Sequence, residues 1–446
     1  METSRTEGNN LSQEGLSESL CSLRSKLYCK AKREPKFRFY TLYGHLLRKD
    51  VLEGAWRRVK RGGPSPGIDG VTVGDLERTG GVEALLLGLE EDLRGRKYRA
   101  SPVLRTYIPK EDGRLRPIGI PTVRDRVVQT ACVLILEAIF EADFKDCSHG
   151  FRPKRSAHDA LDQIKQNLQA GRKTVYDADV KGYFDNIPHD KLMASLEMRI
   201  ADRKVLHLIR QWLKAPVKEK EDRKSGKGGG PLTRSKKGTP QGGVISPLLA
   251  NVYLHWLDTV FSRAKGPGSW AKAKLVRYAD DFVIMAHYVD SRLINWVKQT
   301  IEEWLGLELN EEKTRVLDLR EEGACLDFLG YSFRYDRDLK GRAKRYLNIS
   351  PSAKSLKRER EKLRELTSSK VCFKPIPKLI GELNAHLKGW AAYYRYGYPR
   401  KGYREINWYV RQRLHAHLSR RSQRPWKPKG GRTEYEQYKK WGLVYL

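Results

Sequence analysis

The chain has 446 residues, with 87 Lys and Arg against 54 Asp and Glu, which gives a formal net charge of +33. This length suggests two to four structural units. The large positive charge creates an electrostatic field that favours a polyanionic partner, and nucleic acid is the first such partner to consider. No stretch approaches the roughly 18 apolar residues that span a bilayer, and the N-terminus is polar, so we expect neither a membrane span nor a signal peptide.

The six cysteines are scattered along the chain and form no C-x-x-C pair. This spacing argues against a structural zinc site and against a disulfide framework. We therefore expect free thiols in a reducing, cytoplasmic environment.

The N-terminal part is predicted to begin with helices and to continue with short strands. Residues 1 to about 35 indicate a flexible lead-in that becomes basic and helical. Apolar residues recur at helical spacing over 46–59, before a loop at 62–67 that is rich in Gly and Pro. Strand-like segments on either side of 112–113, an Asp-Gly pair, predict a β-hairpin. A long helix is expected from 124 to about 144.

The central region contains two short apolar segments that carry acids. Residues 174–180 predict a buried strand that leads into Asp179. Residues 276–286 predict a hairpin, in which two apolar strands are joined by the acidic turn at Asp280 and Asp281. A basic, glycine-rich loop over about 217–237 lies between the two segments.

The composition changes beyond Gly330. No aspartate occurs after residue 350, while Arg, Lys, Tyr and Trp become frequent. Residues 351–366 predict a charged helix, and apolar residues at helical spacing over 379–394 predict a second helix with a stripe that faces a core. Domain boundaries near 340 and 375 follow from these changes.

Asp179, Asp280 and Asp281 are the strongest chemical signal in the sequence. Acids that cluster repel one another unless a cation screens them, and carboxylates with water are ligands that suit Mg²⁺. Two such ions about 4 Å apart can activate a 3′-oxygen and stabilise a leaving pyrophosphate. The alternative is a set of solvated turn acids, which the apolar flanks of the turn disfavour.

Further sequence blocks accompany these acids in a recognisable order. The blocks lie at 67–72, 116–121, 149–153, 179–187, 238–251, 309–314 and 328–331. The most specific is GTPQGGVISPLLAN at 238–251. On these blocks the chain, from about residue 46 onward, resembles the reverse transcriptases encoded by bacterial group II introns, which also act as maturases.

The resemblance implies an α+β fold: a right-hand polymerase with fingers, a palm with an antiparallel sheet and a helical thumb, followed by a helical maturase domain. The implied divisions are a flexible basic lead-in (1–35), an N-terminal extension with fingers (36–170), a palm with finger insertions (171–340), a thumb (341–374) and a maturase domain with a short basic tail (375–446). We expect no endonuclease domain, because the tail holds no Cys/His cluster. The tail itself is expected either to contact DNA or to stay solvated.

The resemblance also implies roles for individual residues at the acidic turn. Asp179 and Asp280 would bind two Mg²⁺ ions with help from the Val180 carbonyl, and Asp281 would support the metal site as the third catalytic acid. The implied nucleotide contacts are Lys110, Arg116, Phe184, Gln241 and Lys313.

These nucleotide contacts have distinct expected roles. Lys110 and Arg116 would hold the triphosphate, and Phe184 would crowd a ribose 2′-hydroxyl and so favour dNTPs. Gln241 would contact the nucleotide or the template, and Lys313 would protonate pyrophosphate. Core packing for Phe184, and solvated charges for the three cations, are the alternatives that sequence leaves open.

Arginine interleaved with aromatic residues in the last third of the chain suits structured RNA. The residues singled out for RNA binding are Arg395, Tyr396, Arg400, Arg404, Arg411 and Arg413. The resemblance implies that this region binds the parent group II intron RNA and assists its splicing and retrohoming. Other implied partners are an RNA template with a DNA primer, dNTPs and a DNA target, in a bacterial cytoplasm near the nucleoid.

Three other functions remain open at this point. A splicing factor with an inactive polymerase would not need the three aspartates. An RNA-dependent RNA polymerase would not need the aromatic at Phe184. A reverse transcriptase recruited to host DNA repair cannot be separated by sequence from one that serves its own intron, and the oligomeric state is equally open.

Overall fold

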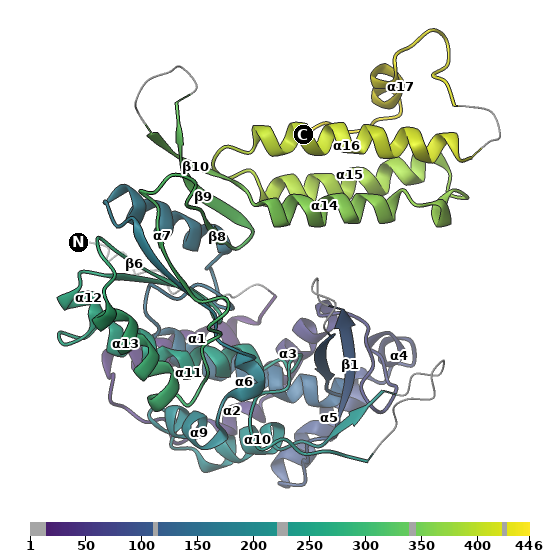
Figure 1. Ribbon diagram of the computed structural model, residues 1–446. Coiled ribbons are helices and arrows are strands. Elements are labelled where there is room, and N and C mark those ends of the chain that lie inside the picture. Colours follow the sequence, from purple (N-terminus) through teal and green to yellow (C-terminus); the bar gives the residue numbers. More distant parts are fainter. Residues whose placement is uncertain (1–14, 110–114, 221–230, 339–344, 422–425) are drawn as a thin grey trace, which may run out of the picture. The chain divides into compact units, whose positions relative to one another are not determined.

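A computed structural model of the chain describes residues 15–109, 115–220, 231–338, 345–421 and 426–446 (Figure 1). Contacts between residues divide the chain into two units: Met1–Arg172 with Tyr176–Arg315, and Lys173–Val175 with Val316–Leu446. None of the helices in the described ranges is long and apolar enough to cross a membrane. The six cysteines all lie in these ranges and form no disulfide, as the sequence predicted.

The core of the first unit is built around α6 (Val123–Glu141), which is buried over most of its length. The Thr122 hydroxyl caps this helix by accepting a hydrogen bond from the Asp125 nitrogen. Two amphipathic helices, α1 (Glu18–Arg33) and α3 (Lys49–Arg61), pack against α6 with their apolar faces. The helices predicted over 46–59 and from 124 onward are confirmed.

The remaining helical segments of this unit add to this core, except α7 (Ala157–Gln169), which packs against β5 (Lys274–Tyr278) and β6 (Asp281–Ala286). They are α2 (Tyr43–Leu46), α4 (Val73–Arg78), α5 (Val82–Arg94), α7 (Ala157–Gln169), α8 (Tyr183–Asn186), α9 (His189–Glu197), α10 (Arg203–Leu213), α11 (Ser246–Phe261), α12 (Pro267–Trp270), α13 (Ser291–Gln299) and the π-helical segment η1 (Thr300–Trp304).

A three-stranded sheet forms from β1 (Val103–Pro109), β2 (Leu115–Ile120) and β4 (Val217–Glu219), in the order β2-β1-β4. Strands β1 and β2 pair antiparallel, with Ile108 opposite Arg116, so the predicted hairpin is confirmed. The residues of its turn lie outside the described ranges. Strand β4 adds to β1 in parallel.

A four-stranded sheet carries the acidic residues, with strand order β5-β6-β3-β7. Its strands are β3 (Thr174–Ala178), β5 (Lys274–Tyr278), β6 (Asp281–Ala286) and β7 (Arg315–Asp318). Strands β5 and β6 form the predicted hairpin, with Tyr278 opposite Asp281 across the turn. Most residues of β3, β5 and β6 are buried, which explains their near-continuous apolar sequences.

The second unit joins a small sheet to a helical bundle. The sheet has the order β10-β9-β8, from β8 (Leu326–Phe328), β9 (Tyr331–Arg337) and β10 (Arg345–Pro351). Helices α14 (Ala353–Leu366), α15 (Ile376–Tyr393) and α16 (Arg400–Ser419) run side by side (Figure 1), with the short η2 (Ser369–Val371) after α14. Leu379, Leu383 and Leu387 are fully buried, so the predicted core stripe is confirmed.

The C-terminal residues are packed more firmly than a solvated tail would be. Helix α17 (Glu434–Lys440) contains Tyr438, which is fully buried, and Leu443 is 5% exposed. Two asparagine side chains hold the chain beyond α17: the Val444 nitrogen donates to Asn384 Oδ1 at 2.9 Å, and the Leu446 nitrogen donates to Asn407 Oδ1 at 3.0 Å. Residues 426–446 are thus largely part of the helical bundle.

Candidate active site

Asp179 follows directly on the buried strand β3. Its main-chain oxygen accepts a hydrogen bond from the Asn310 nitrogen at 2.8 Å, and Val180 bridges to Leu309 in antiparallel fashion. The carboxylate accepts hydrogen bonds at Oδ2 from Asn310 Nδ2, at 3.0 Å, and from Lys313 Nζ, at 3.1 Å. The 309–314 block therefore fixes Asp179 through both backbone and side chain, with Lys313 as its counter-charge.

The turn between β5 and β6 brings the other two acids to the same place. Ala279 adopts a left-handed conformation, with φ of +58°, which non-glycine residues rarely take. Burial raises the pKa of Asp280, and the negative charge of Asp179 raises it further, while Arg116 and Arg277 oppose the shift. The three sequence-predicted acids are thus close enough to repel one another.

The electrostatic stress is greatest at Asp281. The residue as a whole is exposed, but the surrounding protein atoms keep water away from its carboxyl. This desolvation is the largest cause that raises the pKa of the carboxyl from 3.8 to about 7, and repulsion from the charges of Asp280 and Asp179 adds to it. The positive charge of Lys313 lowers that pKa only in part. In the absence of cations, Asp281 is therefore partly protonated near neutral pH.

We expect Asp281→Asn to raise the melting temperature relative to the natural protein at pH 8 in chelator-treated buffer. The folded state holds this proton up to about pH 7, whereas the unfolded chain releases it near pH 4, so stability falls as pH rises through that window. Asparagine removes the effect, and the two melting temperatures should converge near pH 4. Parallel curves of melting temperature against pH would contradict the shift.

The same carboxylates are the candidate metal ligands. Among the described residues, no group of three His, Cys, Asp or Glu side chains is already arranged around a common metal position. The donor set nevertheless fits divalent cations, because Asp179, Asp280 and Asp281 offer oxygen ligands whose mutual repulsion a cation relieves.

The glycine-rich loop before α11 lies between the β1–β2 hairpin and α8. Gln241 accepts a hydrogen bond from the Gly119 nitrogen at its main-chain oxygen (2.5 Å) and donates from Nε2 to Asp185 Oδ2 (3.1 Å). Gly242 has a φ of +108°, and a Cβ there would lie 2.4 Å from the Gly119 oxygen. Only glycine allows β2 and the loop to approach so closely.

Phe184 lies beside this loop. Its ring is half-buried and meets the ring of Tyr183 edge-on at 5.4 Å, and its main-chain oxygen accepts a hydrogen bond from the Thr239 nitrogen at 2.7 Å. Arg116 is exposed on β2, and its charge reaches Asp280. Lys110 lies outside the described residues. The structure thus brings Arg116, Gln241 and Lys313 to the region of the acids, with Phe184 alongside.

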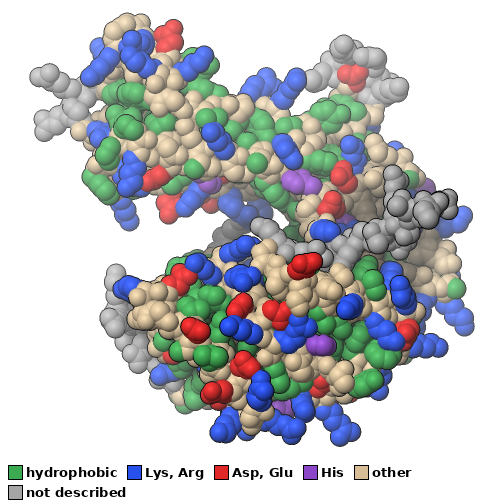
Figure 2. All heavy atoms as spheres, turned by 180° about the vertical axis from the view of Figure 1, so that it is seen from behind, with side chains coloured by type: hydrophobic (Ala, Val, Ile, Leu, Met, Phe, Trp, Pro, Cys, Tyr) green, Lys and Arg blue, Asp and Glu red, His purple; other side chains and the backbone are tan. Residues whose placement is uncertain are grey.

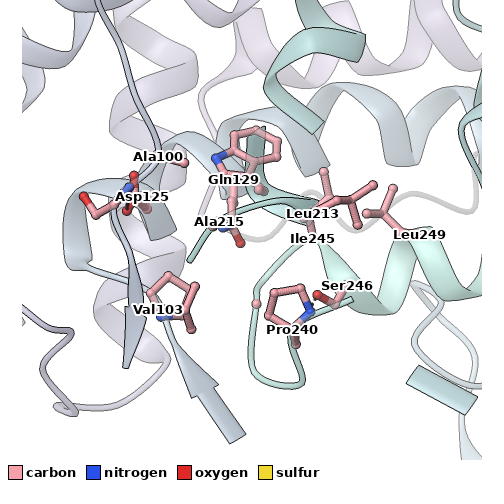
Figure 3. Close-up of a pocket in the computed structure, with 14 residues that line it drawn as sticks. Ala100, Val103, Asp125, Gln129, Leu213, Ala215, Pro240, Ile245, Ser246 and Leu249 are labelled. Carbon is pink, nitrogen blue, oxygen red and sulfur yellow. Dashed lines mark hydrogen bonds between the residues drawn. The ribbon is translucent and has the colours of Figure 1, made fainter. Parts of the chain in front are cut away.

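Polar side chains of α6 lie beside this loop (Figure 3). Gln129 on α6 accepts a hydrogen bond from the Val244 nitrogen at 2.9 Å, and Asp125 accepts one from the Tyr98 hydroxyl at 2.6 Å. These side chains line a cavity of about 10 Å³ together with Pro240 and Ser246, which leaves room for about one water molecule. The cavity is too small for a nucleotide.

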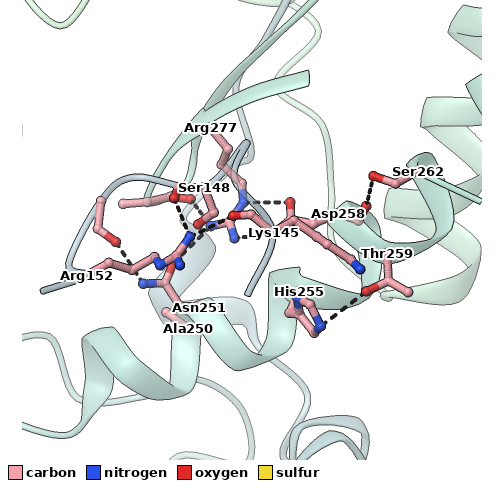
Figure 4. A network of polar contacts seen from close by, with 12 residues as sticks. Lys145, Ser148, Arg152, Ala250, Asn251, His255, Asp258, Thr259, Ser262 and Arg277 are labelled. Carbon is pink, nitrogen blue, oxygen red and sulfur yellow. Dashed lines mark hydrogen bonds and ion pairs between the residues drawn. The ribbon is translucent and has the colours of Figure 1, made fainter. Parts of the chain in front are cut away.

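A buried polar network lies behind the acidic turn, and sequence reasoning missed it (Figure 4). Arg277 on β5 forms an ion pair with Asp258 on α11, and both side chains are fully buried. Asn251 on α11 donates to the Gly150 main-chain oxygen at 2.8 Å. A charged residue inside an apolar strand, and an acid inside the apolar helix α11, are the signals by which the pair could have been found.

The residues predicted to bind RNA all lie on or just before α16. Arg395, Arg400 and Arg404 are exposed, together with the aromatic Trp408, which is 60% exposed. Tyr396, Arg411 and Arg413 are half-buried. Lys and Arg side chains outnumber acids on the face that Figure 2 shows.

Two of these half-buried residues also contact the protein itself. Arg413 donates from Nε to Thr367 Oγ1 at 3.2 Å, and the Tyr396 ring meets the ring of Tyr331 edge-on at 6.0 Å. The exposed arginines therefore offer the more open surface to a polyanion.

Comparison with known proteins places this geometry in a family. Residues 108–333 match the model for reverse transcriptase (RNA-dependent DNA polymerase), and residues 356–435 match the maturase-specific domain of group II introns. The first match contains the three acids, the glycine-rich loop and the buried network. The second contains α15, α16 and most of α14.

Two curated relatives agree with these matches. The chain is 32% identical over 362 residues to the group II intron-encoded protein LtrA of Lactococcus lactis subsp. cremoris, with 67% of this chain and 57% of that protein covered. It is 31% identical over 332 residues to protein YkfC of Escherichia coli, with 67% and 84% covered. The chain thus spans little more than half the length of LtrA. The chain belongs to the family of group II intron-encoded reverse transcriptases and maturases.

Proposed function

We propose that this chain copies RNA into DNA, by joining the 3′-hydroxyl of a DNA primer to the α-phosphate of a dNTP with release of pyrophosphate. The observation that carries the proposal is the gathering of Asp179, Asp280 and Asp281 inside the region that matches reverse transcriptases. We take these three as the catalytic acids. Their carboxylates can hold cations beside the reacting phosphate, and little else is asked of the protein than positioning and charge neutralisation.

Reverse transcriptases generally use divalent metal ions, and we propose two Mg²⁺ ions for this chain. Asp179, Asp280 and the Val180 main-chain oxygen would hold them, with Asp281 in support. When bound, such ions stabilise the charge that develops on the attacking and leaving oxygens. The strong repulsion at Asp281 supports this assignment, because a bound cation would relieve it and so stabilise the folded protein.

Nucleotide binding is assigned to the side chains around the acids. Arg116 and Lys110 would hold the triphosphate, and Gln241 would position the nucleotide or the template strand. Phe184 would exclude a ribose 2′-hydroxyl, and its packing against Tyr183 supports a fixed ring position. We assign proton donation to pyrophosphate to Lys313, whose ammonium is 3.1 Å from Asp179 Oδ2.

Primer extension on an RNA template tests this proposal directly. We expect the natural chain to incorporate dNTPs in Mg²⁺ and Asp280→Asn to lose at least about 1,000-fold in rate, because the acid that holds the cations is gone. Asp162→Asn, which changes an exposed acid on α7, is the matched control and should keep full activity. Unchanged extension by Asp280→Asn would remove the polymerase assignment, and efficient use of rNTPs would contradict the role of Phe184.

We also propose that the second unit binds the parent intron RNA and assists its splicing, and that the protein takes part in retrohoming to a DNA target. The exposed arginines and aromatics of α16, within the maturase-specific match, support this proposal. We also propose the division into lead-in and fingers (1–35, 36–170), palm (171–340), thumb (341–374) and maturase domain (375–446), with the correction that the lead-in is not flexible throughout, because α1 packs against α6.

Salt dependence of binding tests the RNA contacts. We expect Arg400→Ala combined with Arg404→Ala to weaken binding to intron RNA and to reduce the slope of log K against log salt by about 1 for each lost phosphate contact. The control is Arg78→Ala with Arg94→Ala, which removes the same charge from two exposed positions of the first unit. Equal slopes for the two double variants would mean that only net charge matters.

A further inference from the structure

The buried side chain of Arg277 makes hydrogen bonds beyond its ion pair with Asp258. The residue lies on β5, two positions before the acidic turn, and its side chain is 0% exposed. Its guanidinium donates from Nε to Asp258 Oδ1 at 2.9 Å and from Nη2 to Asp258 Oδ2 at 2.5 Å. A bidentate pair of this kind neutralises both charges but leaves Nη1 without a carboxylate.

The remaining nitrogen of Arg277 binds the turn itself. Nη1 donates to the Ala279 main-chain oxygen at 2.8 Å and to Asn251 Oδ1 at 3.0 Å. Ala279 holds the unfavourable left-handed conformation that starts the turn, so its carbonyl direction sets the path into Asp280. Such a conformation persists only where surrounding contacts over-determine it.

The opposite side of the turn is held by the 147–150 segment. The Arg277 nitrogen donates to the Cys147 oxygen at 2.7 Å, and the His149 nitrogen donates to the Arg277 oxygen at 2.9 Å. Gly150 follows, and its oxygen accepts from Asn251, the residue that also accepts from the guanidinium. Figure 4 shows Arg277 between α11 and this segment, with Asp258 and Asn251 on the helix.

We propose that Arg277 is a positioning residue for nucleotidyl transfer: it holds the Ala279 carbonyl, and through it Asp280, while Asp258 and Asn251 hold the guanidinium in place. The proposal rests on the proposed function, because it assumes that Asp280 acts in catalysis. An apolar side chain at this position could preserve packing but not the hydrogen bond to the turn.

A purely structural role predicts a different outcome from a positioning role. Replacing a buried ion pair by apolar residues of similar size often leaves stability unchanged, whereas removing one partner strands a buried charge. The double variant Arg277→Met/Asp258→Leu therefore tests the hydrogen bond to Ala279 in a protein that is expected to fold. The control is Arg24→Met/Glu137→Leu, a pair between α1 and α6 in the same unit whose side chains are 0% and 16% exposed, and in which Arg58 also approaches Glu137 at 3.9 Å.

We expect the Arg277→Met/Asp258→Leu variant to bind primer–template with unchanged Kd, to lose roughly 100-fold in kcat, and to need more Mg²⁺ for half-maximal rate. The Arg24→Met/Glu137→Leu control should keep kcat and its Mg²⁺ dependence. Arg277→Lys, which keeps the charge but has its donors on a single nitrogen, should recover part of the lost rate.

Equal kcat in the two double variants would overturn the proposal and leave Arg277 as a structural ion pair. So would a loss of primer–template binding with kcat retained. A natural chain that extends no primer would refute the proposed polymerase function instead. If the first double variant does not fold, Asn251→Leu is measured in the same way; it removes one partner of Nη1 and the hydrogen bond to the Gly150 oxygen while leaving the ion pair intact. A kcat equal to that of the natural chain would then count against the proposal.

Discussion

The Gly150→Ala variant should lose about 100-fold in polymerase rate while still binding primer–template. A Cβ at this position would lie 2.3 Å from the Ala279 nitrogen and 3.0 Å from the Tyr278 carbonyl carbon. Both atoms are backbone, so neither can rotate away, and the turn that carries Asp280 must move. A displacement on the order of 1 Å in catalytic geometry costs about 100-fold in rate. Pre-steady-state extension at saturating dNTP measures the effect.

Two other glycines serve as controls, because alanine at these positions adds a methyl group without a clash. A Cβ at Gly88 on α5 or at Gly381 on α15 would have nothing within 4 Å. Alanine at either position should keep the rate and should stabilise its helix by up to about 1 kcal/mol. Gly150→Ala should instead destabilise the fold by about 1–3 kcal/mol. A Gly150→Ala protein with the natural rate would mean that the turn tolerates the displacement.

Glu141→Ala should destabilise the first unit by about 3–5 kcal/mol, the largest effect on stability that we expect from any single substitution discussed here. Arg152 donates from Nε to Glu141 Oε2 at 3.0 Å and from Nη2 to Oε1 at 2.6 Å, and the two side chains are 2% and 1% exposed. Alanine would leave a buried guanidinium without its carboxylate. The midpoint of urea unfolding, followed by tryptophan fluorescence, measures the loss.

The neighbouring pair of Arg155 and Asp146 is the control. Its Nη2–Oδ1 distance is also 2.6 Å, but Asp146 is 87% exposed, so Asp146→Ala should cost less than about 1 kcal/mol. Glu141→Leu combined with Arg152→Met should recover part of the stability, although the Lys145 and Ser148 oxygens then lose a donor. Similar midpoints for Glu141→Ala and Asp146→Ala would contradict the importance of burial.

Local periodicity and turn chemistry made much of the fold predictable. The strands on either side of the acidic turn, the fingers hairpin and the apolar stripe of α15 all depend on residues close in sequence, and the structure confirms them. The buried networks left only a partial local signal, a charged residue inside an apolar strand and an acid inside α11, and their pairing was not predictable. Arg277 and Asp258 are 19 residues apart, and Asn251 meets Gly150 across 101 residues. Which residues become partners depends on how α11 packs against the sheet, and local sequence patterns do not determine that packing.

In the candidate site, too, features that depend on nearby residues were predictable and contacts between distant residues were not. The three acids were evident because carboxylates are rare between apolar strands unless they have a function. The packing of Gly150 against the Ala279 nitrogen was not evident, because it depends on a close approach of backbone segments that are distant in sequence. The ordered packing of Tyr438 and Leu443 was missed because the basic composition of the tail suggested a solvated segment.

The contact between Lys313 and Asp179 makes loading of the proposed metal site an ion exchange. The ammonium, 3.1 Å from Oδ2, is already the counter-ion of this carboxylate, so a divalent cation at that oxygen would compete with it. The free energy of metal binding at the proposed site would therefore be reduced by the cost of weakening this ion pair. Once displaced, the ammonium is free to meet the incoming triphosphate. Cation uptake and nucleotide uptake are thereby linked, and each should tighten the other.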